Sequence, residues 1–166
     1  MTNYTVDTLE LGPFTTESGE TILNLKLRYE HVGYEGQPLV LVCHALTGNH
    51  LTYGTDDNPG WWREIIDGGY MPIHDYQFLT FNVIGSPYGS SSPLTDADFP
   101  THLTLRDIVN AIELGIQTLG FDRISILIGG SLGGMQALEL LYNHKFEVDK
   151  AVILAATDKT SSYSRA

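Results

Sequence analysis

The sequence predicts an α/β fold with a mostly parallel sheet and flanking helices, and three observations support this prediction. Two unbroken apolar runs, residues 39–43 and 124–128, are typical of central strands that are buried on both faces. Apolar residues at three- and four-residue spacing predict a long helix over residues 101–119. The second apolar run passes through the glycine-rich residues 129–134 directly into another amphipathic segment, which indicates a strand, a tight turn and a helix in succession.

The composition is that of one globular domain, which we expect to occupy residues 1–166. Apolar residues make up 42% and charged residues 17% of the sequence, which allows a sizeable core. Nine basic against 20 acidic residues give a formal net charge of −11, and such a surface repels nucleic-acid phosphates and anionic lipids. The single cysteine, Cys43, leaves no internal disulfide and no cysteine zinc site. Because there is also no apolar leader or membrane-spanning run, we expect a cytoplasmic protein that binds neither nucleic acid nor membranes.

The N-terminal elements are predicted to form an antiparallel edge of the sheet. Residues 5–11 and 21–29 carry alternating apolar residues, and residues 17–20 form a turn between them. A polar loop over residues 31–37 then leads to the first central strand. Three leucines of the second edge strand are expected on one face: Leu23, Leu25 and Leu27.

The middle of the chain is predicted to alternate helix and strand. A short helix follows Trp61 and Trp62, whose rings we expect in the core or in a pocket wall, with core packing favoured over contact with a substrate. A strand over residues 76–83 runs into a glycine- and serine-rich loop at residues 84–93. This loop is either a ligand-binding loop at the carboxyl end of a central strand or a plain connector.

The predicted helix over residues 101–119 has a clear start signal. Thr104 and Asp107 resemble a capping box, in which each residue satisfies a free amide of the other. After the amphipathic segment that follows residue 131, a polar turn is predicted over residues 143–150 and a further buried strand over residues 151–156.

The glycine-flanked Ser131 is the strongest candidate for chemistry. In a Gly-x-Ser-x-Gly elbow the serine lies on a strained turn between a strand and a helix, and side chains at Gly129 and Gly133 would collide with neighbouring backbone. A glycine-flanked serine is also common in ordinary turns, but the buried strand before it and the helix after it favour the elbow. The helix N-terminus would then direct its free amides and positive dipole end at an oxyanion beside Ser131.

Acyl transfer through a serine needs two amide donors for the oxyanion. The residue after the nucleophile, Leu132, supplies one, and a loop after an earlier central strand supplies the other, for which we choose Leu46. His44 and His50 in the same loop could suggest a metal site. Because no carboxylate or cysteine lies at a ligand-like spacing, we predict loop roles for both histidines and no metal.

Taken together, these motifs resemble those of homoserine O-acetyltransferases, which belong to the α/β-hydrolase superfamily. The matching stretches follow the order of that family over most of the chain, and together they are far more specific than the elbow alone. They are residues 43–48 (Cys-His-Ala-Leu-Thr-Gly), 60–62 (Gly-Trp-Trp), 82–85 (Asn-Val-Ile-Gly), 89–93 (Gly-Ser-Ser-Ser-Pro), 103–109 (Leu-Thr-Leu-Arg-Asp-Ile-Val) and 129–137 (Gly-Gly-Ser-Leu-Gly-Gly-Met-Gln-Ala).

The resemblance implies an α/β-hydrolase fold and a ping-pong acyl transfer early in methionine biosynthesis. Ser131 would take an acetyl group from acetyl-CoA and pass it to the side-chain hydroxyl of L-homoserine. By residue match, Ser131 is the nucleophile, and the amides of Leu46 and Leu132 form the oxyanion hole. The implied partners are small molecules, with acetyl-CoA as a co-substrate and no bound cofactor. Homodimers are common in this family, so a homodimer is one assembly that the full-length protein could adopt.

The sequence departs from the family pattern downstream of the elbow. Proteins of this family are about twice as long, and their triad Asp and His follow well after the nucleophile. The only downstream histidine here, His144, is predicted at the far end of the elbow helix, too far from Ser131 to act as its base. Asp149 and Asp158 have no histidine to orient. We therefore expect residues 1–166 to be the N-terminal part of a single acyltransferase domain, without its lid and last strands, and with little activity alone.

Several alternatives stay open at the level of the sequence. Family members that acylate serine, or that use succinyl-CoA, share the same elbow. A carboxylesterase of the same fold would transfer the acyl group to water. A half-domain without a base could also be a non-enzymatic binding module whose open sheet edge is covered by a partner. The backbone cost of the glycines around Ser131 argues against that last alternative, because a binding module has no use for them.

Overall fold

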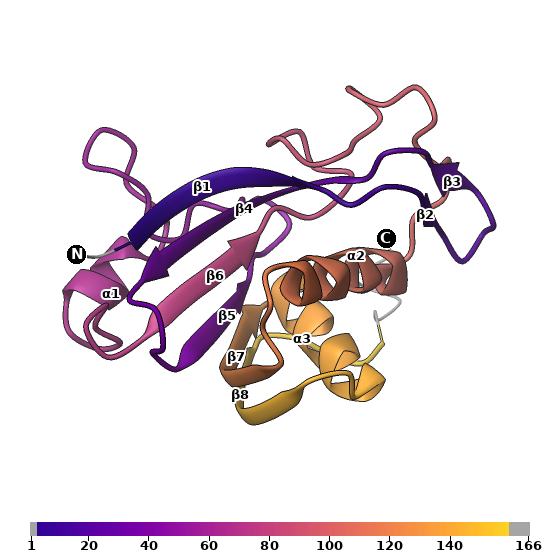
Figure 1. Cartoon of the computed structure of the whole chain (residues 1–166). Coiled ribbons are helices and arrows are strands. Elements are labelled where there is room, and N and C mark those ends of the chain that lie inside the picture. The colour runs from indigo at the N-terminus through magenta and orange to yellow at the C-terminus, as the bar shows by residue number, and fades with distance from the viewer. Residues whose placement is uncertain (1–2, 160–166) are drawn as a thin grey trace.

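The computed structural model describes residues 3–159, and within them one six-stranded sheet lies between helices, with a small two-stranded ribbon at its side (Figure 1). Residues 1–2 and 160–166 lie outside the described residues. In chain order the elements are β1 (Asn3–Glu10), β2 (Phe14–Thr15), β3 (Thr21–Ile22), β4 (Lys26–Gly33), β5 (Leu39–Cys43), α1 (Arg63–Asp67), β6 (Gln77–Phe81), α2 (Leu105–Thr118), β7 (Arg123–Gly130), α3 (Leu132–Asn143) and β8 (Glu147–Leu154).

The sheet has the strand order β1-β4-β6-β5-β7-β8. Strands β6, β5, β7 and β8 run parallel, whereas β1 and β4 form an antiparallel edge. The predicted mostly parallel sheet with an antiparallel N-terminal edge is therefore confirmed. Because Cys43 at the end of β5 pairs with Gly129 near the end of β7, the loops that follow these two strands leave from the same edge of the sheet.

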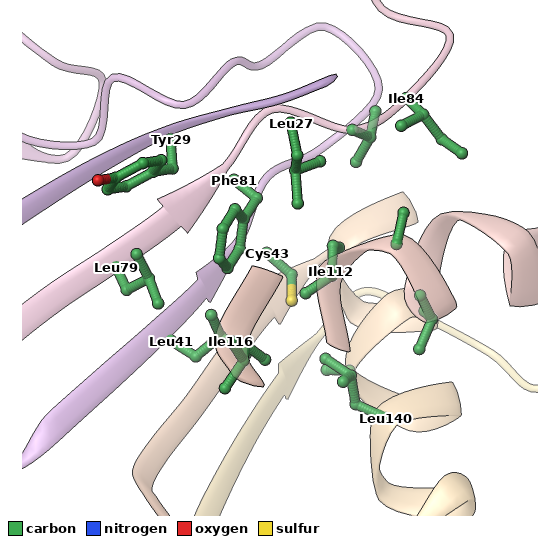
Figure 2. Packing of buried hydrophobic residues seen from close by; sticks show 14 of the residues in the cluster. Leu27, Tyr29, Leu41, Cys43, Leu79, Phe81, Ile84, Ile112, Ile116 and Leu140 are labelled. Carbon is green, nitrogen blue, oxygen red and sulfur yellow. The ribbon is translucent and has the colours of Figure 1, made fainter. Parts of the chain in front are cut away.

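The side of the sheet that α2 and α3 cover, here called the helix face, carries the larger apolar core. Burial of apolar side chains is the main favourable contribution to folding, and it does not depend on the orientation of the groups in contact. Strand residues meet helix residues there (Figure 2): Leu41, Cys43, Leu79 and Phe81 against Ile112, Ile116 and Leu140.

The opposite side, here called the loop face, is covered by α1 and by residues 49–62. Its apolar cluster is smaller, and a buried carboxylate lies beside it. Glu30 of β4 is only 1% exposed and accepts the backbone amides of Thr52, Tyr53 and Gly54 at 2.7, 2.8 and 2.7 Å. Burial raises the pKa of Glu30, while these three amides oppose that rise. The buried apolar residues of the cluster are Val32, Val40, Val42, Ile66, Phe78 and Ile128.

Residues 49–62 form an irregular hairpin across the loop face. Trp61 and Trp62 donate their amides to the carbonyls of Leu51 and Thr52, at 3.1 and 3.0 Å. Trp62 packs against the loop-face core, as expected. Trp61 is not in the core, since it is 40% exposed and its indole nitrogen donates to the carbonyl of Asn49 at the surface. It lies instead in the wall of a surface pocket, which is the other position expected for it.

The N-terminal edge differs in detail from the prediction. The expected strand over residues 21–29 is interrupted, since β3 ends at Ile22 and β4 begins at Lys26. The amide of Leu23 is held by the Asp98 carboxylate at 2.6 Å, and its side chain is 70% exposed, so Leu23 does not share a face with the buried Leu25 and Leu27. Residues 31–33, expected in a loop, continue β4 in register with β1.

The C-terminal strand also departs from the prediction. Part of the expected polar turn over residues 143–150 is strand, because β8 begins at Glu147. Arg123 of β7 explains this, since it ion-pairs with Glu147 at 3.2 Å and Asp149 at 2.6 Å across the two strands. The expected burial of residues 151–156 is wrong as well. Strand β8 pairs only with β7 among the described residues, and the side chains of Val152 and Leu154 are exposed.

Helix α2 begins with the predicted capping box. Thr104 accepts the amide of Asp107 at 3.1 Å, and the Asp107 carboxylate accepts the amide of Thr104 at 3.0 Å. The helix therefore starts at Leu105, a few residues later than the predicted range. Asp107 also accepts the amide of Glu17 at 2.8 Å, so the cap joins α2 to the loop between β2 and β3.

Candidate active site

Ser131 lies on the turn between β7 and α3, where the backbone is strained. Its φ of 54° and ψ of −123° place a non-glycine residue in the positive-φ region that L-residues rarely adopt. The amide of Ser131 donates to the carbonyl of Leu154 at 2.9 Å, which ties the turn to the end of β8. The side chain is exposed at the carboxyl edge of the sheet. These are the features of a nucleophile elbow.

Gly129 and Gly133 flank Ser131 at positions where neighbouring backbone comes too close for a side chain. A Cβ on Gly129 would lie 2.2 Å from the carbonyl oxygen of Gly133. A Cβ on Gly133 would lie 2.0 Å from the carbonyl oxygen of Cys43, at the end of β5. The predicted steric reason for the motif is therefore present in the structure, and the second contact joins the elbow to the strand that carries the oxyanion loop.

The loop after β5 turns sharply over residues 45–48, where the amide of Gly48 donates to the carbonyl of Ala45 at 2.9 Å. Leu46 lies at the tip of this turn with its side chain 77% exposed. Within residues 3–159, the amides of Leu46 and Leu132 donate to no protein acceptor. Both residues line the same pocket, so two free donors are available beside the elbow.

His44 holds the oxyanion loop from inside the fold. Its ring is fully buried, Nε2 accepts the amide of Val83 at 3.1 Å, and Nδ1 bonds to the carbonyl of Ala45 at 2.8 Å. Because Nε2 is an acceptor, the neutral ring carries its proton on Nδ1 and donates from there. Burial lowers the pKa of His44 and keeps the ring neutral. The predicted loop role for His44 therefore fits its contacts.

Gln136 of α3 is a site residue to which the sequence alone assigned no role. Its side-chain amide donates to the carbonyl of His44 at 3.2 Å, and its Oε1 is buried with no partner among the described residues. This bond fixes the start of the oxyanion loop to the elbow helix. Gln136 is part of the matching stretch 129–137, but nothing in its spacing signals a contact with a loop some ninety positions earlier.

His50 closes the same loop and is 7% exposed, with Nδ1 buried and unpartnered within the described part of the chain. Burial, helped by the positive charge of Arg28, lowers the pKa of His50 to about 4. Both histidines of the loop are neutral at physiological pH, and within the described residues neither makes a hydrogen bond to Ser131. Among residues 3–159, no group of three His, Cys, Asp or Glu side chains is placed to hold a metal ion.

The pocket beside the elbow has a volume of about 480 Å³. Its wall is formed by residues 46–47, residues 83–88, Leu103, Ile108 and Leu132. The predicted loop over residues 84–93 divides into two parts with different contacts. Its first part lines the pocket, as expected for a loop at the carboxyl end of a central strand.

The second part of that loop anchors it to β4. Ser90 accepts the amide of Arg28 at 2.9 Å and donates to the carbonyl of Asn82 at 2.6 Å, while Ser91 accepts the amide of Lys26 at 3.0 Å. The serine run therefore satisfies the backbone of β4 beyond the last residue that pairs with β6. As a result, the pocket-lining residues before it are attached to a rigid strand.

No general base for Ser131 is found in residues 3–159. His144 caps the C-terminal end of α3, and a helix of twelve residues spans about 18 Å at 1.5 Å per residue. Asp149 is engaged by Arg123, and Asp158 accepts a hydrogen bond from Thr157. Within the described residues, no side chain hydrogen-bonds the Ser131 hydroxyl.

Comparison with known proteins agrees with this geometry. A family model described as the alpha/beta hydrolase fold matches residues 38–166. The chain belongs to the α/β-hydrolase fold family. Among solved structures, a homoserine O-acetyltransferase from Staphylococcus aureus is 82% identical and superposes with a TM-score of 0.97 over 98% of this chain. The structure of esterase E22 is 25% identical, with a TM-score of 0.74 over 96% of this chain.

Curated relatives carry the same name as the S. aureus protein. A homoserine O-acetyltransferase from Methanococcoides burtonii is 38% identical over 96% of this chain, and one from Haloferax prahovense is 33% identical over 94%. The resemblance predicted from the motifs is thus confirmed. The chain spans 36% and 41% of these two relatives, and 50% of the S. aureus chain.

Proposed function

We propose that this chain is part of a homoserine O-acetyltransferase, which moves an acetyl group from acetyl-CoA through an acyl-serine to the hydroxyl of L-homoserine. The observation that carries the proposal is the 82% identity to the S. aureus homoserine O-acetyltransferase over 98% of this chain. The strained turn at Ser131 and the two free amides beside it supply the chemistry that such a transfer needs.

In the first half-reaction, the Ser131 oxygen attacks the thioester carbonyl while a base takes its proton. The carbonyl oxygen becomes an oxyanion, which accepts hydrogen bonds from the amides of Leu46 and Leu132 near the positive end of α3. When this intermediate collapses, the carbon–sulfur bond breaks, the thiol leaves with the proton, and an acyl-serine remains. The homoserine hydroxyl then attacks the acyl-serine by the same route in reverse.

The contacts of His44 explain how the oxyanion amides are ready before substrate binds. His44 joins the loop to Val83 and, through its carbonyl, to Gln136 of α3. The loop therefore does not have to reorganise when charge develops, and such preorganised donors contribute more to catalysis than mobile ones. The base belongs to the remainder of the longer polypeptide, since residues 3–159 place none beside Ser131.

The proposal extends to the cellular setting. The enzyme would work in the cytoplasm on small molecules, with acetyl-CoA as a co-substrate and no resident cofactor. Within the described residues, no helix has the length and apolarity needed to cross a membrane.

The test is acylation of the full-length polypeptide that contains this chain. After a short exposure to acetyl-CoA, intact mass spectrometry should show one added acetyl group, and the Ser131→Ala variant should show none. Addition of L-homoserine should discharge the acyl-enzyme and form O-acetylhomoserine. Discharge at the same rate by water alone would instead indicate an esterase, which is the activity named for one of the similar structures.

A further inference from the structure

The two candidate oxyanion donors belong to different elements, so their separation is set by contacts between those elements. The amide of Leu132 opens helix α3, whereas the amide of Leu46 lies in the tight turn after β5. The side chain of Leu46 is 77% exposed, so its packing does little to hold the turn in place. Donors of this kind must be placed closely, because a misplacement of about 1 Å can cost about 100-fold in rate.

One buried side chain joins the two elements. Gln136 lies four residues after Leu132, which places it one turn further along α3 on the same side of the helix. Its Nε2 donates to the carbonyl of His44 at 3.2 Å, and His44 lies two residues before Leu46. The path from one oxyanion amide to the other therefore consists of one helical turn, one hydrogen bond and two residues of the loop.

The helix approaches the loop closely because Gly133 has no side chain. A Cβ there would lie 2.0 Å from the carbonyl oxygen of Cys43 and 2.9 Å from that of His44. Gln136 is only 1% exposed, and a hydrogen bond that is shielded from water is stronger than an exposed one. Only Nε2 can make this bond, since Oε1 and the carbonyl are both acceptors.

We propose that Gln136 is a positioning residue for the acyl transfer, which holds the two oxyanion amides at the separation that the tetrahedral intermediate requires. The inference rests on the proposed acyl transfer through Ser131. Within the described residues, Gln136 makes no hydrogen bond to Ser131, so it acts through the carbonyl of His44. We expect its effect on the rate of acylation and not on the affinity for acetyl-CoA, because the negative charge on the oxygen develops only in the transition state.

Replacement by glutamate tests the donated hydrogen bond itself. In Gln136→Glu, the protonated carboxyl can donate to the carbonyl of His44 as Nε2 does, whereas the ionised carboxylate can only accept. Burial raises the pKa of a carboxyl above its ordinary value of about 4.3. The acylation rate of this variant, divided by the wild-type rate at the same pH, should therefore be highest at acid pH and should fall as the pH rises. A role in filling space alone would give a ratio that does not depend on pH.

The experiment measures acylation of Ser131 by acetyl-CoA in the full-length polypeptide, with rapid quench and intact mass. Between about pH 5.5 and about pH 8.5, the maximal rate of Gln136→Glu relative to the wild type should fall at least about tenfold. The acetyl-CoA concentration that gives half of the maximal rate should not change. Gln136→Met keeps the length of the side chain but has no donor, so it should be about tenfold to 100-fold slower than the wild type at every pH.

Gln77→Glu is the matched control. Gln77 is 6% exposed, and its Nε2 donates to the carbonyl of Gln37 at 2.5 Å, at the amino end of β6 and away from the elbow. Its rate relative to the wild type should not depend on pH. Near-UV circular dichroism restricts the comparison to folded protein, and if Gln136→Glu unfolds as the pH rises, Gln136→Met decides the outcome.

Three results would overturn the positioning role. They are a wild-type acylation rate in Gln136→Met, a ratio for folded Gln136→Glu that does not change with pH, and an equal pH-dependent loss in Gln77→Glu. In each of these cases the wild type is still acylated, so the proposed acyl transfer would stand. If acetyl-CoA does not acylate Ser131 in the wild type, the proposed function fails and the positioning role fails with it.

Discussion

The two faces of the sheet are held by different forces. On the helix face, α2 and α3 bury a large apolar core. The stabilisation from this burial depends on the apolar area removed from water and not on the orientation of individual groups. On the loop face, a smaller apolar cluster is supplemented by directional hydrogen bonds, above all the three amides on Glu30. The backbone amides of residues 52–54 do not pair with a neighbouring strand. The buried Glu30 carboxylate accepts their hydrogen bonds instead.

The candidate site lies where these two faces meet. Leu132 begins α3, which belongs to the helix face, whereas the loop that carries Leu46 continues into residues 49–62 of the loop face. The contacts between Gly133 and Cys43, and between Gln136 and His44, join the two parts. Mutations at the seam should therefore affect both faces, and mutations on one face should leave the other in place.

The largest effect is expected in the elbow, beside this seam. Gly129→Ala would place a Cβ 2.2 Å from the carbonyl oxygen of Gly133, a backbone atom that no rotamer change can move away. We expect a loss of about 4 kcal/mol or more in the free energy of unfolding, measured by urea denaturation. Gly130→Ala is the matched control in the same motif, since its Cβ would have no neighbour closer than 3.8 Å. Equal losses in the two variants would refute the close-packing explanation.

The next effect concerns pH and the loop face. The pKa of His50 is about 4 in the folded chain, against about 6.5 in an unfolded one. As the pH falls from about 6.5 to about 4, His50 binds a proton in the unfolded state before it does so in the folded state. The stability of the folded state that comes from a neutral His50 is therefore fully present above about pH 6.5 and is lost on acidification. The loss amounts to roughly 3 kcal/mol.

The measurement is urea denaturation across this pH range for the wild type and for His50→Gln. Below about pH 6.5, the free energy of unfolding of the wild type should fall steadily relative to that of His50→Gln. The exposed His102 gives the control, because His102→Gln should keep the full pH dependence of the wild type. A pH profile that His50→Gln leaves unaltered would contradict the assignment.

A smaller effect is expected from Glu30→Gln. The neutral amide keeps the size of the side chain but loses the charge that accepts three backbone amides, so we expect a loss of about 2 kcal/mol. Hydrogen exchange should show the change locally, as faster exchange at Thr52, Tyr53 and Gly54 with little change in α2 and α3. The exposed Glu35 supplies the control variant, Glu35→Gln. Uniformly faster exchange across both faces would show that the faces are not separable.

The smallest effect is expected on the helix face, at the cap of α2. Thr104→Ala removes the hydroxyl that accepts the amide of Asp107, and such caps contribute about 1 kcal/mol. Thermal unfolding should show a modest decrease in Tm, with acylation of Ser131 unchanged. Thr118→Ala at the other end of the helix, where the hydroxyl makes no hydrogen bond among the described residues, should have no measurable effect. A larger loss at Thr118 than at Thr104 would contradict the capping role.

The sequence by itself determined the features that depend on local sterics and spacing. The apolar runs of β5 and β7, the capping box of α2 and the elbow at Ser131 were all predictable, because each is specified by residues within one turn or one strand of one another. The motif matches also indicated the family, since they preserve the order of several short segments along the chain.

The tertiary structure alone decided what depends on residues far apart in the sequence. Only folding shows that Glu30 holds residues 52–54, that Gln136 reaches His44, and that Arg123 draws Glu147 into a strand. The exposure of Leu23 and Trp61 has the same origin, because their alternation and hydrophobicity favour burial but distant partners hold their backbone or ring at the surface. Hydrophobic pattern specifies which face a residue prefers, whereas long-range hydrogen bonds decide whether the chain can place it there.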